Sequence, residues 1–87
     1  MKPFNVAIVN ADTILYEGTA VSLVVPAGLG SMGILADHVP IISTLGKGSV
    51  TLLKNFSDPA QVFSTNGSGF VEVSRESVTV LLDCAKG

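Results

Sequence analysis

Residues 26–48 read P-A-G-L-G-S-M-G-I-L-A-D-H-V-P-I-I-S-T-L-G-K-G and decide how the chain folds. This stretch holds five of the nine glycines, two of the four prolines and the single histidine, His38. Glycine adopts positive φ without steric penalty and proline removes a backbone donor, so their density predicts tight turns rather than one long element. Valine-rich runs lie on both sides, and we expect the stretch to be presented by the strands that these runs form.

The flanking runs alternate along the chain with the period of two that is typical of β-strands. Phe4, Val6 and Ile8 define one face of a first strand. Residues 70–74 and 77–83 predict a hairpin that turns at Arg75-Glu76, with Val78, Val80 and Leu82 on one face of its second strand. No segment has helical periodicity over ten or more residues. Short strands with turn signals roughly every 8–12 residues predict an all-β fold, either an antiparallel sandwich or a barrel.

Two finer predictions concern residues 14–25. Ile14-Leu15-Tyr16 predicts a short strand, or a continuation of the first one, that Glu17-Gly18 closes. Residues 19–25 then predict one further strand, with Val21, Leu23 and Val25 on one face. The other face of that strand is also fairly apolar, which indicates that something packs against it.

Composition limits the function classes. A chain of 87 residues makes one domain, and 47% of its residues are hydrophobic while 14% are charged, against roughly 25% charged in an average domain. A domain of this size buries only about 60% of the surface that its unfolded chain exposes. We therefore expect a partner to cover part of the apolar surface. The alternative is a well-filled core with few surface charges. A net charge of −2 with five scattered Lys and Arg disfavours nucleic acid as a ligand.

Chemistry based on cysteine or metal is equally disfavoured. One Cys excludes a disulfide within the chain, and one Cys with one His is too few for a zinc site. The N-terminal residues lead into the first strand without a secretory apolar region, and no apolar run reaches the ~18–20 residues of a membrane-spanning helix. We therefore expect a chain of cytosolic type.

Two catalytic or nucleotide-binding readings fail on local geometry. Gly28-x-Gly30-x-x-Gly33 has the dinucleotide-binding spacing, but Pro40 would break the helix required there and residues 50–57 hold no acidic residue for a ribose. His38 has the pKa range of a general base, yet Asp37 beside it points to the opposite face in extended backbone and cannot orient it. The residues therefore predict no cofactor and no enzymatic site, and favour a binding or assembly module.

The chain as a whole resembles the N-terminal β-sandwich domain of the epsilon subunit of F-type ATP synthase, the subunit called delta in mitochondria. The resemblance extends from about residue 4 to about residue 85. Its most specific part combines G-I-L-x-x-H-x-P with the later G-F-V-E-V. The motifs that carry it are, in order, Leu15-Tyr16-Glu17-Gly18, Gly33-Ile34-Leu35 with His38-x-Pro40, Leu45-x-x-Gly48, Gly69-Phe70-Val71-Glu72-Val73 and Val78-Thr79-Val80-Leu81-Leu82-Asp83.

The resemblance implies a flattened antiparallel β-sandwich of about ten strands. It also implies a non-catalytic rotor subunit of the central stalk, which links gamma to the c-ring of a proton-translocating ATP synthase and couples rotation to ATP synthesis. Such a subunit is peripheral to the membrane, on the cytoplasmic face of the bacterial inner membrane or its organellar equivalent. No small-molecule ligand is expected.

Site residues follow from the resemblance position by position. The turn Gly28-Leu29-Gly30-Ser31-Met32 matches the loop that meets the c-ring. The family usually has an acidic residue there, where this chain has neutral ones, and Asp37, which stands where glycine is usual, is a candidate replacement for that charge. The residues that match the segment near gamma are His38, Pro40, Ile42 and Ser43, with Asn10 at the end of the first strand.

The family pattern extends beyond the last residue of this sequence. The family continues into a pair of C-terminal helices, whereas this sequence stops at Gly87, so we expect neither hairpin-type inhibition nor hairpin-type ATP binding from these residues.

The alternative function is a free-standing β-sandwich that binds peptide or carbohydrate through its glycine-rich turns. The absence of Trp and the single Tyr argue against a sugar site. A small enzyme built on His38 is the third and weakest reading.

Overall fold

The computed structural model describes residues 2–10, 12–27, 30–34, 40–66 and 69–82, and this part of the chain contains strands and turns but no helix. It confirms the all-β prediction, with nine strands in the described ranges against the expected number of about ten. The strands are β1 (Phe4–Val9), β2 (Ile14–Ala20), β3 (Ser22–Ala27), β4 (Gly30–Ile34), β5 (Ile41–Thr44), β6 (Lys47–Leu53), β7 (Gln61–Asn66), β8 (Gly69–Val73) and β9 (Ser77–Leu82).

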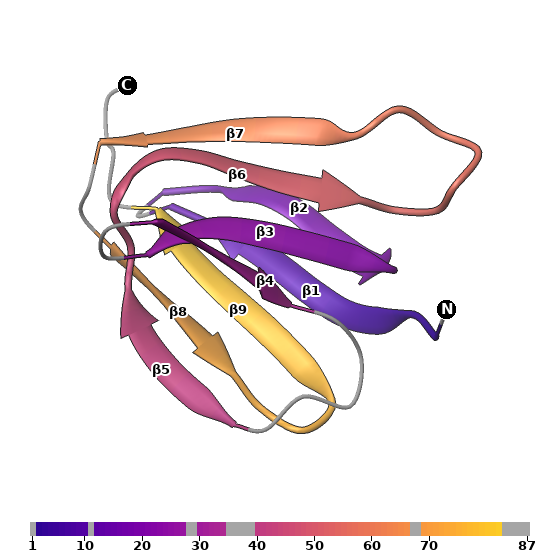
Figure 1. Ribbon diagram of the computed structural model, residues 1–87, viewed down its shortest axis with the longest axis horizontal. Helices are drawn as coiled ribbons and strands as arrows, with labels where there is room; N and C mark the ends of the chain where they lie inside the picture. Colours follow the sequence, from indigo (N-terminus) through magenta and orange to yellow (C-terminus); the bar gives the residue numbers. More distant parts are fainter. Residues whose placement is uncertain (1, 11, 28–29, 35–39, 67–68, 83–87) are drawn as a thin grey trace.

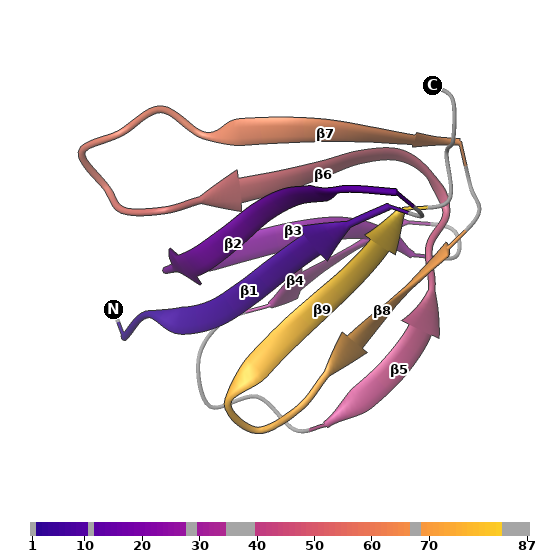
Figure 2. The same cartoon turned by 180° about the vertical axis from the view of Figure 1, so that it is seen from behind.

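The strands form two sheets that pack face to face (Figures 1 and 2). One sheet has five strands in the order β2-β1-β9-β8-β5, and the other has four in the order β4-β3-β6-β7. Every neighbouring pair is antiparallel, as predicted, except β1 and β9, which run parallel. These two strands lie near opposite ends of the chain, so no hairpin connects them and none imposes an antiparallel arrangement.

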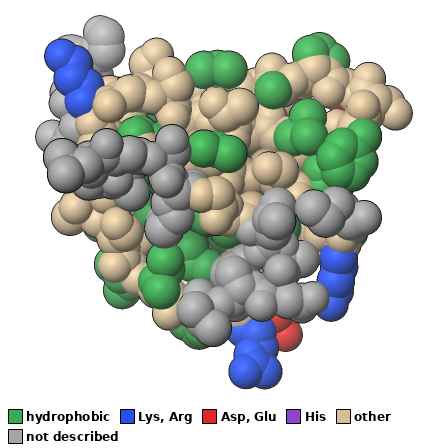
Figure 3. Space-filling model, in the orientation of Figure 1, with side chains coloured by type: hydrophobic (Ala, Val, Ile, Leu, Met, Phe, Trp, Pro, Cys, Tyr) green, Lys and Arg blue, Asp and Glu red, His purple; other side chains and the backbone are tan. Residues whose placement is uncertain are grey.

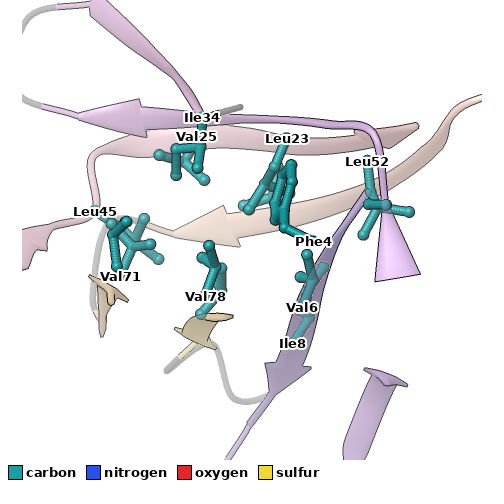
Figure 4. Packing of buried hydrophobic residues seen from close by; sticks show 14 of the residues in the cluster. Phe4, Val6, Ile8, Leu23, Val25, Ile34, Leu45, Leu52, Val71 and Val78 are labelled. Atoms are coloured by element: carbon teal, nitrogen blue, oxygen red, sulfur yellow. The ribbon is translucent and has the colours of Figure 1, made fainter. Parts of the chain in front are cut away.

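The core lies between the sheets and is built from alternate residues of nearly every strand. In Figure 4, Leu23 and Val25 of one sheet face Val71 and Val78 of the other. The predicted buried faces of β1, β3 and β9 are confirmed, because alternation places every second side chain on the same side of a sheet. The largest fully buried side chains are Ile8, Leu23, Leu52, Leu82, Val25, Val50, Val71, Val78 and Val80.

The prediction that Glu17-Gly18 closes a strand is wrong, because β2 continues to Ala20. The hydroxyl of Tyr16 donates a hydrogen bond to the carbonyl of Thr19 over 2.6 Å. A Cβ added to Gly18 would lie 3.4 Å from that hydroxyl oxygen, so the tyrosine side chain covers the glycine. The aromatic side chain thus supplies the packing that glycine lacks, and the strand passes through.

The prediction of a single strand over residues 19–25 is also wrong. The chain leaves the five-stranded sheet after Ala20 and enters the four-stranded sheet at Ser22. Between them, the amide of Val21 donates to the carbonyl of Leu53 over 2.9 Å, and the Val21 side chain remains buried. Apolar alternation continues across the change of sheet, so the sequence pattern alone does not reveal it.

The two ends of the glycine-rich stretch 26–48 meet in the structure. The amide of Gly46 donates to the carbonyl of Pro26 over 2.8 Å, and a Cβ added to Gly48 would lie 3.4 Å from the Cβ of Pro26. Gly48 has φ of 152°, a conformation that side-chain-bearing residues rarely adopt. The two ends of the stretch therefore lie side by side.

Candidate functional site

The outer face of the five-stranded sheet carries a row of apolar side chains that crosses four strands. Strand register places Phe70 opposite Leu81, Leu81 opposite Val9, and Val9 opposite Ile14. Residues directly opposite each other on one face are in contact range, so the four side chains form one continuous row. We call Phe70, Leu81, Val9 and Ile14 the apolar row.

The apolar row is accessible to solvent. The side chain of Ile14 is 61% exposed and that of Phe70 is 40% exposed, while Val9 and Leu81 are half-buried by their neighbours. The register of β1 against β2 shifts between Ile8 and Val9, so Leu15 adds another exposed apolar side chain at this end. A contiguous apolar surface of this kind on a small domain is typical of a protein interface.

A second row runs beside the apolar row, two residues away along β1, β8 and β9 and three residues away along β2, where the register shifts. It passes from Ile42 to Glu72, Thr79, Ala7 and Glu17 by strand register. Glu17 and Glu72 are the only charged residues in the five described strands of this sheet, so these strands contain no Lys or Arg. Within the described ranges, no ion pair or hydrogen bond engages either carboxylate. We call this second set the acidic row.

The opposite side of the molecule, formed by the four-stranded sheet, has a different character. Figure 3 views it from this side, and lysine and arginine side chains lie at its margins. Strand register aligns Gly33, Val24, Thr51 and Val62 across this sheet, so a glycine and a hydroxyl group interrupt the apolar side chains. A continuous exposed apolar row therefore distinguishes the five-stranded sheet.

The residues predicted to lie near gamma are distributed along the five-stranded sheet. Ile42 projects from edge strand β5 and is 73% exposed, which is the largest value among the exposed large hydrophobic residues. It lies diagonally across from Phe70, because Thr44, two residues further along β5, is directly opposite Phe70. Pro40 is exposed just before β5. His38 lies outside the described residues.

Ser43 and Asn10 are the other two candidates for the contact with gamma that the structure describes. Ser43 pairs with the buried Val71, and its hydroxyl donates to the carbonyl of Thr44 over 3.1 Å, so it faces the side opposite to Ile42. Asn10 follows β1 at the far end of the sheet from Pro40. Its side-chain oxygen accepts hydrogen bonds from the amides of Asp12 and Thr13, which shapes the turn that ends beside Ile14. The apolar row begins beside this turn, at Ile14, and ends at Phe70 on β8, the strand next to β5.

The predicted c-ring loop is described only in part. Gly28 and Leu29 lie outside the described residues, as does Asp37, while Gly30, Ser31 and Met32 open strand β4. Figure 1 places the start of β4 at the same end of the sandwich as the turn between β1 and β2. The apolar row and the candidate c-ring residues Gly30, Ser31 and Met32 therefore lie at the same end of the molecule.

None of the four residues of the apolar row is predicted as a site residue from the sequence. Each is an apolar residue on the face of its strand opposite to the buried set, so apolar residues occupy both faces near the ends of β1, β8 and β9. That two-sided pattern is the available signal. Their proximity depends on strand register, which joins residues from both ends of the chain.

The described ranges offer little that indicates chemistry. No group of three or more His, Cys, Asp or Glu among them could hold a metal ion. Nor does any helix in these ranges have the length and apolar character needed to cross a membrane.

A β-sandwich with one continuous, exposed apolar row across a sheet face is typical of the class of protein-interaction domains. The chain matches the family model described as ATP synthase, Delta/Epsilon chain, beta-sandwich domain, over residues 3–86. The chain therefore belongs to the delta/epsilon chain family of ATP synthase. This confirms the resemblance found in the sequence.

Curated relatives agree with the family match. The ATP synthase epsilon chain of Dichelobacter nodosus is 38% identical over 81 residues, which are 93% of this chain and 55% of that relative. The epsilon chain of Shouchella clausii is 34% identical over 86 residues, which are 99% of this chain and 62% of that relative. The chain thus spans between about half and two thirds of the length of these relatives.

Solved structures show the same fold at low sequence identity. A chain of the Euglena gracilis mitochondrial ATP synthase, in a cryo-EM structure of OSCP, F1 and c-ring, aligns with a TM-score of 0.78 at 16% identity, over 88% of this chain and 48% of that one. A chain of the Tetrahymena thermophila mitochondrial ATP synthase, from its central stalk and c-ring, aligns with a TM-score of 0.74 at 12% identity, over 92% and 63%. Both confirm the two-sheet architecture.

Proposed function

We propose that the chain acts in the central stalk of a proton-translocating F-type ATP synthase, as a non-catalytic rotor element that links gamma to the c-ring. The apolar row is the observation that carries this proposal. Such a surface is unfavourable in water and becomes stabilising when a partner covers it. The family relationship favours gamma as that partner, and the exposure of Ile42 beside the row extends the surface to edge strand β5.

The position of the start of β4 supports the proposed contact with the c-ring. The start of β4, where the loop candidates Gly30, Ser31 and Met32 lie, is at the end of the sandwich reached by the apolar row. Contact of this end with the c-ring would leave the outer sheet face available to gamma. A closely packed sandwich deforms little under load, so it suits the transmission of rotation between the two. The chain would then be held at the cytoplasmic face of the membrane, or its organellar equivalent, through the complex.

Replacing Ile42 with lysine tests this proposal at the edge of the surface. The parent chain is expected to co-elute one-to-one with the gamma subunit from the same source in size-exclusion chromatography. Ile42→Lys is expected to weaken the complex roughly tenfold, because it removes an apolar contact at the edge of the surface and places a competing cation opposite Glu72. Ile42 is 73% exposed in the free chain, so its replacement should leave thermal unfolding nearly unchanged.

The control is Val62→Lys, at an exposed valine on the four-stranded sheet. It makes a comparable change of charge on the opposite side of the molecule and should leave co-elution intact. Separation of the parent chain from gamma at micromolar concentrations would contradict the proposal. Equal binding by Ile42→Lys and the parent would remove β5 from the contact surface.

A further inference from the structure

We infer that the segment of gamma which covers the five-stranded sheet carries two basic side chains, one for Glu17 and one for Glu72, beside the apolar residues that cover the apolar row. This inference rests on the proposed function and adds the chemistry of the contact. It assigns Glu17 and Glu72 as residues that determine which partner binds and in which orientation.

Each of the two carboxylates borders its own hollow on the sheet. A hollow of about 300 Å³ lies over the small side chain of Ala7, between Glu17 on β2 and Thr79 on β9, with Asn5 and Ser77 at one side. Because Ala7 is small and its neighbours are larger, the sheet surface is depressed there. A long side chain from a partner fits such a depression along its aliphatic stem.

The second hollow lies at the edge of the sheet, beside β5 and β8. It has a volume of about 390 Å³ and is lined by Pro40, Ile42 and Glu72, together with Ser74. Pro40 and Ile42 supply apolar walls and Glu72 supplies the single charge. Each hollow thus places one carboxylate beside apolar or small side chains.

The distance between the carboxylates requires two cations rather than one. Glu72 and Glu17 lie on β8 and β2, three strand intervals apart, so their backbones are separated by about 14 Å. One ammonium or guanidinium group forms an ion pair only within about 4 Å, so a single cation cannot engage both carboxylates. The apolar row runs about 7 Å to one side on β1, β8 and β9, at two residues along each of these strands. The partner must therefore present two basic groups along one line and apolar side chains along a parallel line.

The sign of the partner's charge follows from what the sheet lacks. The five strands carry no Lys or Arg, so covering Glu17 and Glu72 with apolar or acidic residues would leave two carboxylates desolvated without a counter-charge. An anionic lipid surface is disfavoured for the same reason, because like charges would be brought together. A basic and apolar protein segment is the occupant that satisfies both rows.

The test measures affinity for the purified gamma subunit by isothermal titration calorimetry, for Glu17→Gln, Glu72→Gln and the double variant. Each single change is expected to weaken binding roughly tenfold, since it leaves a covered cation without its partner. The double variant should be weaker than either. Raising the salt concentration from about 50 to 500 mM should weaken the parent complex more than that of the double variant, because salt screens the lost ion pairs.

The matched control is Glu76→Gln, which makes the same chemical change in the turn between β8 and β9, away from both hollows of the outer face. It should bind within about twofold of the parent. Equal affinity and equal salt dependence of the parent and the double variant would overturn the inference while leaving the proposed function intact. Failure of the parent chain itself to bind gamma would overturn the proposed function, and the inference with it.

Discussion

Replacing Leu52 with alanine is expected to lower the free energy of unfolding by about 3–4 kcal/mol. Leu52 is fully buried on β6, directly opposite Leu23 on β3, so the truncated side chain would leave a cavity between the two sheets. A domain of this size has a total stability of about 5–10 kcal/mol, so the change removes a large part of it. The midpoint of thermal unfolding should fall by roughly 15–25 °C.

The next residue on the same strand provides the control. Leu53→Ala makes the identical chemical change on the opposite face of β6, where the side chain is half-buried and faces outward. Its cost should stay near 1 kcal/mol, because little surrounding structure closes over it. Urea unfolding of both variants measures the difference. Equal losses would contradict the assignment of the two faces of β6.

The Leu81→Lys variant is expected to fold normally and to lose roughly 30-fold to 100-fold in affinity for gamma. Leu81 lies near the middle of the apolar row, between Phe70 on β8 and Val9 on β1. Central residues of an interface contribute most to affinity, because their surroundings exclude water. A lysine there would place a charge against apolar neighbours on both sides. Calorimetric titration against gamma measures the loss.

Two controls accompany this variant. The thermal unfolding midpoint of Leu81→Lys should stay close to that of the parent, since the side chain faces outward from the sheet and the buried set of β9 is untouched. The outward-facing Val62→Lys on the other sheet should bind gamma as the parent does. Undiminished binding by a folded Leu81→Lys would contradict the role of the apolar row.

The buried half of this structure could be predicted from the sequence because each strand carries its own pattern. Alternation with a period of two identified Val78, Val80 and Leu82 as one face of β9, and all three are buried. The turn at residues 55–59 also depends on local contacts. There the Asn55 side chain accepts hydrogen bonds from the amides of Ser57 and Asp58, which is a common turn geometry for asparagine.

What could not be predicted depends on contacts between distant parts of the chain. The continuation of β2 through Gly18 depends on the Tyr16 side chain, and the change of sheet at Val21 leaves the alternation unbroken. The parallel pairing of β1 with β9 has no local sequence signal. The apolar row depends on that pairing, because it brings Val9 beside Leu81. Single residues such as Ile42 could be proposed from a family pattern, but a surface that spans four strands requires the register.

The proposed binding surface for gamma is the outer face of the five-stranded sheet. It is tested most directly by methyl NMR of the unmodified chain with a soluble paramagnetic agent, before and after addition of gamma. We expect the methyl groups of Ile14, Ile42 and Leu81 to become protected from the agent, while those of Val24 and Val62 on the other sheet stay as accessible as before. Protection of Val24 and Val62, with Ile14 and Leu81 still accessible, would contradict it.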